Sequence, residues 1–291
     1  MLGLRERLCF ELSRRLMTPP DQRQSNMGTY LDWREDSLRA SWSRFSDAEV
    51  IGKDLLDFGC GYGNLSFFLA KKGARRVVGI DLGPEAIESN RRRIPEVALP
   101  PGTSIEFVVG KVDGIPLPDQ SFDTITAFDC LEHVMSPERV LKDWFRVLRP
   151  GGKVLIEWFP FRGPWGPHME ALIPVPWAHV VFGERAMFRA AQRIYALPDF
   201  QPRAWDLDPN GQKLPNKWLA WESFKEQGYV NQLSVDGFRG LAEGTGFLVP
   251  RFEAHGFSSA PARKLVSQAL LNLPKVGEYF TSYVLVELQR P

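Results

Sequence analysis

The sequence predicts an α/β protein built on a doubly wound parallel sheet. Between residues 54 and 160, short apolar runs rich in β-forming residues alternate with helical segments. This alternation implies parallel strands, because only a crossover connection can join two parallel neighbours. The stretch "DFGCGYGNL" at 57–65 places three glycines at alternate positions behind the first apolar run. Such a cluster between a strand and a helix is typical of a backbone that another group approaches closely.

Start and stop signals define the elements of this repeat. The helix at 64–73 stops at a glycine, and the helix at 84–94 opens with a proline and an acid, as helix N-termini favour. The helix at 137–148 is expected to end at the Pro-Gly-Gly run at 150–152. In chain order we expect a strand at 54–60, a helix at 64–73, a strand at 76–82, a helix at 84–94, strands at 104–110 and 121–130, a helix at 137–148 and a strand at 153–159.

The first 50 residues are predicted to be helical and amphipathic. Leucines recur every four residues between arginines, at Leu4, Leu8, Leu12 and Leu16. We expect this helix to pack on the body of the protein through its leucine stripe. A helix that lies on a membrane surface is the alternative.

Residues 161–230 interrupt the repeat as an insertion rich in proline and tryptophan, helical near 183–197. The repeat then resumes with a helix at 234–246, a strand at 247–257, a helix at 262–271 and a last strand at 282–289. A chain of 291 residues with 44% hydrophobic content is long for one domain, which suggests one domain with an insertion. The predicted segments are an N-terminal helical segment (1–50), a core (51–160), a cap insertion (161–230) and the C-terminal part of the core (231–291).

Composition excludes several classes of protein. The net charge is +1, from 36 Lys and Arg against 35 Asp and Glu. The chain therefore lacks the excess of positive charge that is typical of proteins that bind nucleic acid. The cysteines Cys9, Cys60 and Cys130 form no C-x-x-C pair, which argues against a disulfide framework and against a zinc site; we expect no metal. No apolar stretch approaches the roughly 20 residues that are needed to cross a bilayer. Charged residues interrupt the N-terminal segment, where a signal peptide would be continuously apolar. We therefore expect a soluble, cytoplasmic protein.

The glycines and one aspartate predict a binding site for a nucleoside. In an open parallel sheet, ligands bind at the carboxyl ends of the strands, where bare backbone amides at a helix start can contact them. Asp81 closes the second strand 20 residues after Gly61, where an acid can accept hydrogen bonds from ribose hydroxyls. Asn64 stands where the dinucleotide fingerprint requires its third glycine, which disfavours a diphosphate. A tight turn without a ligand and a solvated strand-end aspartate are the alternatives.

The motifs "LLDFGCGYGN", "VVGIDL", "GKVDGIPL" and "FDCLEHV", in this order, carry a family resemblance. Residues 54–160 resemble the core of class I S-adenosylmethionine-dependent methyltransferases of the ubiquinone/menaquinone-biosynthesis-like type. The resemblance implies a Rossmann-like, seven-stranded, mostly parallel sheet with an antiparallel last strand. It also implies S-adenosyl-L-methionine as the cofactor, bound over the first two strands.

The resemblance assigns roles to residues of this chain. It places Asp57, Gly59 and Gly61 at the methionine end of the cofactor, and Asp81 at the ribose. Lys111 stands where the family often has an acid beside the adenine, so Asp113 or the backbone of Val112 takes that role. Asp129, Leu131 and His133 are expected to border the methyl group. The expected cofactor-binding residues are Asp57, Gly59, Cys60, Gly61, Asp81, Leu82, Val112, Asp113 and Asp129. Cys130 is expected to be a packed residue, because methyl transfer needs no covalent enzyme intermediate.

Histidine is the natural base for the acceptor near neutral pH. We expect His133 or His168 to remove the acceptor proton, with His179 a weaker candidate and His255 structural. The aromatic insertion is expected to fold over the cleft as a lid and to enclose an apolar or aromatic acceptor, unless it is only a well-packed loop.

The resulting prediction is an O-methyltransferase of a small apolar or aromatic molecule. Transfer to nitrogen or carbon is the near alternative. A protein that binds S-adenosylmethionine without methylating, and an NAD-dependent oxidoreductase, are the remaining hypotheses. Asn64 speaks against the oxidoreductase.

Overall fold

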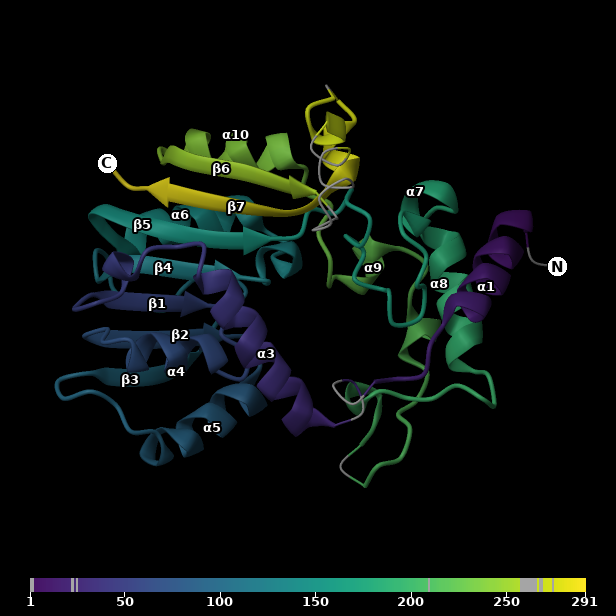
Figure 1. Ribbon diagram of the computed structural model, residues 1–291, viewed down its shortest axis with the longest axis horizontal. Helices are drawn as coiled ribbons and strands as arrows, with labels where there is room; N and C mark the ends of the chain where they lie inside the picture. The colour runs from purple at the N-terminus through teal and green to yellow at the C-terminus, as the bar shows by residue number, and fades with distance from the viewer. Residues whose placement is uncertain are drawn as a thin grey trace. The chain divides into compact units, whose positions relative to one another are not determined.

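The computed structural model describes residues 3–21, 24, 26–208, 210–256, 266, 269–273 and 275–291. The chain forms two compact units (Figure 1). The sheet unit comprises Trp33–Trp158, Val235–Ala254 and Tyr283–Pro291, and the helical unit comprises Met1–Asp32, Phe159–Ser234 and His255–Ser282. The predicted segments 1–50 and 231–291 are therefore each divided between the two units. The helix expected at 262–271 lies largely outside the described residues.

A seven-stranded sheet has the order β3-β2-β1-β4-β5-β7-β6 (Figure 1). The pairs from β3 to β5 are all parallel, whereas β7 pairs with β5 antiparallel. The predicted mostly parallel sheet with an antiparallel last strand is thus confirmed. The strands are β1 (Asp54–Phe58), β2 (Arg76–Asp81), β3 (Ser104–Val109), β4 (Phe122–Phe128), β5 (Leu148–Trp158), β6 (Leu248–Gly256) and β7 (Thr281–Gln289).

Helices cover both faces of the sheet. On one face, residues of α3, α4 and the adjoining strands share a core that includes Trp42, Leu69 and Phe128. On the other face, Trp144 of α6 meets Phe58 edge to face at 5.2 Å. The helices of this unit are α3 (Met27–Trp42, in the unit from Trp33), α4 (Asn64–Lys71), α5 (Pro84–Arg93), α6 (Pro137–Val147) and α10 (Val235–Thr245).

The Pro-Gly-Gly run at 150–152 does not follow a helix end as expected. Helix α6 ends at Val147, and β5 begins at once with Leu148. The register passes from Phe122↔Leu148 to Thr124↔Lys153, so the run lies in a bulge of β5. A bulge can hold a proline because it lies outside the regular ladder of hydrogen bonds.

An ion-pair network joins the amino ends of β1 and β4. The Arg149 guanidinium donates to Asp54 at 2.8 Å and to Asp123 at 2.7 Å. Asp123 also accepts from the backbone N–H of Asp54 at 2.9 Å, and Arg75 donates to Asp54 at 2.8 Å. The hydrogen bond from Arg75, followed by that from Arg149, holds the pKa of Asp54 below its usual range. This network lies at the edge opposite to the glycine loop, which marks it as structural.

Replacing Arg149 with methionine should therefore lower the free energy of unfolding by about 1–2 kcal/mol, because two carboxylates lose a shared donor. Urea denaturation of the variant and the parent chain measures this change. Affinity for any ligand at the carboxyl edge should stay the same, and a loss of affinity equal to the loss in stability would contradict the structural role.

The helical unit has a core of its own. Helices α1 (Leu4–Leu16) and α8 (Glu184–Tyr195) contact each other, and α7 (Ala178–Val181) and α9 (Phe224–Gln227) belong to the same unit. The core includes Phe10, Ile173, Phe188, Tyr195 and Phe224. The helix predicted near 183–197 is confirmed as α8.

The predicted packing of the N-terminal helix is wrong. In α1, Leu4, Leu8, Leu12 and Leu16 are 73%, 51%, 40% and 47% exposed. The helix packs through Cys9, Phe10 and Ser13, which lie on the side of the helix that adjoins the leucine stripe. Phe10 fills the space against α8 that the leucine stripe was expected to fill.

No helix within the described ranges combines the length and the apolar composition that crossing a bilayer requires.

Candidate functional site

The carboxyl edge of the sheet has its topological switch point between β1 and β4, where the order of the strands reverses. The two segments that follow these strands touch. Cys130 Sγ, after β4, lies 3.2 Å from the carbonyl oxygen of Phe58, to which it donates. Burial is the largest of the causes that raise the pKa of the Cys130 thiol well above its usual range. The thiol therefore stays protonated and packed, as expected for a residue that is not a nucleophile.

The structure explains why the loop after β1 has glycine at three positions. Gly59, Gly61 and Gly63 have φ values of 72°, 48° and 72°, in the left-handed region. A Cβ at position 59 would lie 2.6 Å from Cys130 Cβ, and one at position 63 would lie 2.9 Å from the Phe107 ring. At Gly61 no atom outside the glycine and its two chain neighbours lies within 4 Å of the Cβ position. The first and third glycines thus permit packing, whereas the second faces open space.

Asp81 holds this loop in place from the neighbouring strand. Its carboxylate accepts from the backbone N–H of Gly61 at 2.9 Å and from that of Gly83 at 2.8 Å. The side-chain amide of Asn90 donates to the Gly61 carbonyl at 2.7 Å, and Arg93 donates to the carbonyl of Tyr62 at 2.7 Å. Sequence reasoning missed Asn90 and Arg93. The signal in the sequence was an asparagine between the charged residues of "ESNRRR". The structure shows that this asparagine is buried.

Asp57 lies buried beneath the loop. Its carboxylate accepts from Ser66 Oγ at 2.5 Å and from Thr126 Oγ1 at 3.0 Å. Burial raises the pKa of Asp57 to about 6, against the lowering effect of these two hydroxyl donors. Asp57 therefore links β1, α4 and β4 at the switch point.

The raised pKa of Asp57 predicts a change in the pH dependence of stability. Since the pKa is raised from about 3.8 in the unfolded chain to about 6 in the fold, the folded state binds more protons between these values. Ionisation of Asp57 thus costs stability as the pH rises from 4 to 7. An Asp57→Asn variant avoids this cost, so its stability relative to the parent should rise by up to about 3 kcal/mol over that range. Thermal melts at a series of pH values measure the difference, and parallel curves for the two proteins would contradict the assignment.

Two exposed apolar side chains lie at the carboxyl ends of β2 and β3. Leu82 is 58% exposed and Val112 is 78% exposed. The backbone joins their segments, because the N–H of Gly110 donates to the Asp81 carbonyl at 2.7 Å. Lys111 and Asp113 are exposed in the same turn. This edge thus offers apolar surface beside Asp81, where the adenine was expected.

The segment after β4 concentrates carboxylates. Asp129 has a left-handed backbone with φ of 54° and forms an ion pair with Arg34 of α3 at 2.5 Å. Glu132 is 1% exposed, and its burial and the nearby Asp129 raise its pKa well above its usual range. His133 ends the same short 3₁₀ helix (Leu131–His133) and is half-buried. Arg34 was not predicted, because nothing local to α3 indicates its partner.

The carboxylates make the neighbourhood of the loop electronegative. Burial raises the pKa of the Cys60 thiol far above its usual range, and the charges of Asp57 and Asp81 raise it further. A site with this field favours a cationic ligand over an anionic diphosphate.

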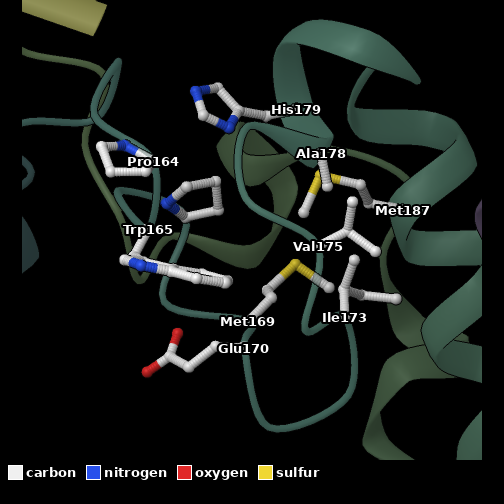
Figure 2. Close-up of a pocket in the computed structure, with 10 residues that line it drawn as sticks. Pro164, Trp165, Met169, Glu170, Ile173, Val175, Ala178, His179 and Met187 are labelled. Atoms are coloured by element: carbon white, nitrogen blue, oxygen red, sulfur yellow. The ribbon is translucent and has the colours of Figure 1, made fainter. Parts of the chain in front are cut away.

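The helical unit contains a small pocket of its own (Figure 2). Its cavity volume is only about 10 Å³, which is room for about one water molecule. Its lining is mainly apolar, with Trp165, Met169, Ile173 and Met187 among the lining residues. Burial lowers the pKa of His179 to about 4, so this lining histidine is neutral at pH 7. His168, the other predicted candidate of this unit, has φ of 52° and its ring meets Phe159 at 5.9 Å.

The order of the strands and the glycine loop after β1 are those of a Rossmann-like fold. Residues 56–156 match a family described as a methyltransferase domain. This match confirms the resemblance of residues 54–160 to the class I S-adenosylmethionine-dependent methyltransferases. The cofactor of this family is S-adenosyl-L-methionine.

Curated relatives agree on the class and differ in the acceptor. The chain is 36% identical over 121 residues to a ubiquinone biosynthesis O-methyltransferase of Aeromonas salmonicida, a match that covers 41% of this chain and 48% of that protein. It is 37% identical over 119 residues to phosphoethanolamine N-methyltransferase 1 of Arabidopsis thaliana, covering 41% and 23%. The chain thus spans about half the length, or less, of these relatives.

Solved structures show the same fold. An S-adenosylmethionine-dependent methyltransferase from Mesorhizobium loti matches with a TM-score of 0.50 and 19% identity, over 89% of this chain and 98% of that one. A putative methyltransferase of Haloferax volcanii, solved with its Trm112 activator, matches with a TM-score of 0.50 and 16% identity, over 89% and 95%.

The residues present fit S-adenosylmethionine. The space over Gly61 is open, so a ligand can reach the backbone there. Two amide donors orient the Asp81 carboxylate and leave it lone pairs for ribose hydroxyls. The electronegative surroundings suit a cofactor that carries positive charge and no phosphates.

Proposed function

We propose that this protein transfers a methyl group from S-adenosylmethionine to an oxygen of a small apolar or aromatic molecule. The observation that carries the proposal is the open backbone at Gly61 beside the carboxylate of Asp81. The matches to ubiquinone biosynthesis O-methyltransferases support oxygen as the acceptor atom. The proline- and tryptophan-rich composition of residues 161–230, which are expected to enclose the acceptor, supports an apolar one.

Each part of the site has a role in this proposal. When bound, S-adenosylmethionine supplies an electrophilic methyl group on a cationic sulfonium. Gly59, Cys60 and Gly61 bind its methionine end, Asp81 and Leu82 hold the ribose, and the turn with Val112 and Asp113 borders the adenine. Asp57 supports the loop from beneath, and Asp129 borders the reacting end. Alignment of two reactants in this way is worth up to roughly 7–11 kcal/mol of the barrier.

A base must also remove the proton of a hydroxyl acceptor, a contribution of roughly 10²- to 10⁴-fold. His133 follows β4 at the carboxyl edge, and His168 belongs to the helical unit. We assign this role to one of these two histidines. The proton passes from the acceptor oxygen to the ring nitrogen as the oxygen attacks.

The histidine assignment predicts that His133→Ala or His168→Ala lowers turnover by at least about 100-fold with little change in cofactor affinity. Transfer of labelled methyl groups to a panel of phenols, amines and carbon acids measures turnover, and calorimetry measures affinity. The matched control is His255→Ala, in β6. Full activity in both variants would remove histidine from the mechanism. Labelling of amines alone would replace oxygen by nitrogen as the acceptor atom.

A further inference from the structure

Helix α1 presents an apolar face that its own unit does not bury. The four leucines of α1 are each at least 40% exposed, whereas Cys9 is 0% and Phe10 is 4% exposed. The exposed face and the packed face thus adjoin each other on one helix. Figure 1 shows α1 beside α8.

The exposure of the leucines does not result from a loosely held helix. Phe10 belongs to the core of the helical unit, and the Arg193 guanidinium of α8 lies 3.9 Å from the centre of its ring. The helix start is capped, because Glu6 accepts from the backbone N–H of Gly3 at 3.0 Å. The helix is therefore anchored while its leucines face solvent.

The shape of the leucine stripe suits a flat surface better than another helix. Each step of four residues turns about 40° around the helix, so the four leucines cover an arc of about 120°. A seam between two helices needs apolar residues every 3.5 residues on average. Four partly exposed leucines also fall well short of the roughly 800 Å² that each partner of a standard protein interface buries. A second copy of the chain is therefore a poor occupant.

The charge on α1 indicates which kind of flat surface the helix binds. Arginines Arg5, Arg7, Arg14 and Arg15 outnumber the acids Glu6 and Glu11, so α1 carries a charge of +2, while the whole chain carries +1. Arg14 also faces Asp199 at 3.8 Å, on the exposed surface. Arg5 and Arg15 fall within the leucine arc, at opposite ends of the helix. Basic residues beside a wide apolar arc are the features of a helix that lies in the interface of an anionic membrane.

We propose that α1 docks the protein on an anionic lipid surface, with its leucines in the acyl boundary and its arginines at the phosphates. This docking is independent of the proposed methyl transfer. Because Cys9 and Phe10 remain packed on α8, binding requires no rearrangement of the helical unit.

Vesicle flotation tests the proposal with the full chain and phosphatidylcholine vesicles, with or without phosphatidylglycerol. The parent protein should float only with the anionic vesicles and should be released by high salt. A Leu8→Gln/Leu12→Gln variant should bind on the order of tenfold more weakly. An Arg5→Gln/Arg15→Gln variant should bind the anionic vesicles more weakly by a similar factor. The matched control is Leu219→Gln, at a residue of the same unit that is 70% exposed, and it should bind like the parent.

All four substituted residues of α1 lie outside the core, so the melting temperatures should match that of the parent. Failure of the parent protein to float with the anionic vesicles would overturn the proposal. Equal loss in the Leu219 control, or sedimentation as a dimer that the leucine substitutions dissociate, would overturn it as well. Neither outcome bears on cofactor binding, which calorimetry measures separately.

Discussion

Replacing Gly61 with alanine is expected to weaken the binding of S-adenosylmethionine by roughly 10- to 100-fold. The new methyl group would occupy the open space over the loop, where no residue other than the two chain neighbours comes within 4 Å of the Cβ position. A ligand that contacts the backbone at this point would meet the methyl group instead. The left-handed backbone adds a stability cost of about 1–2 kcal/mol.

Gly63→Ala provides the matched control for this prediction. It imposes a similar left-handed strain, but its Cβ would lie 2.9 Å from the Phe107 ring. Strain and overpacking together should lower the free energy of unfolding by about 2–5 kcal/mol. Chemical denaturation and calorimetry of the two alanine variants separate the effects. If Gly61→Ala bound the cofactor like the parent, the open space would not be the binding surface.

The second large effect is expected from Asp81→Ala, which should weaken cofactor binding by roughly 1–3 kcal/mol. Two causes act together. The ribose loses a charged acceptor, and the loop loses the carboxylate that accepts from the N–H groups of Gly61 and Gly83. Titration calorimetry of the variant measures the loss.

Asp123→Ala is the control for Asp81, because Asp123 also accepts from a backbone N–H and lies at the opposite edge of the sheet. It should lower stability and leave cofactor affinity unchanged. Equal affinity in Asp81→Ala and the parent protein would remove Asp81 from the site.

Much of the sheet unit could be predicted from the sequence, because its strands are short apolar runs that parallel sheets bury on both faces. The glycine loop and Asp81 were also predictable, since both lie where a strand ends and the chain has little conformational choice. The structure adds why each glycine stands there: Gly59 and Gly63 pack against side chains, and Gly61 alone faces open space.

The remaining features depend on packing between distant segments. The leucine spacing in α1 identified an apolar arc but could not show that Phe10, on the adjoining sector, makes the contact with α8. Asn90 and Arg93 reach carbonyls 29 and 31 residues away, and the ion pair of Arg34 with Asp129 joins α3 to the segment after β4. Spacing along the chain does not indicate such pairs.

Calorimetric titration of the purified protein with S-adenosylmethionine, S-adenosylhomocysteine and NAD tests the central claim most directly. The open glycine backbone, the oriented Asp81 carboxylate and the electronegative surroundings predict micromolar binding of both sulfur nucleosides and none of NAD. Binding of NAD alone would contradict the account.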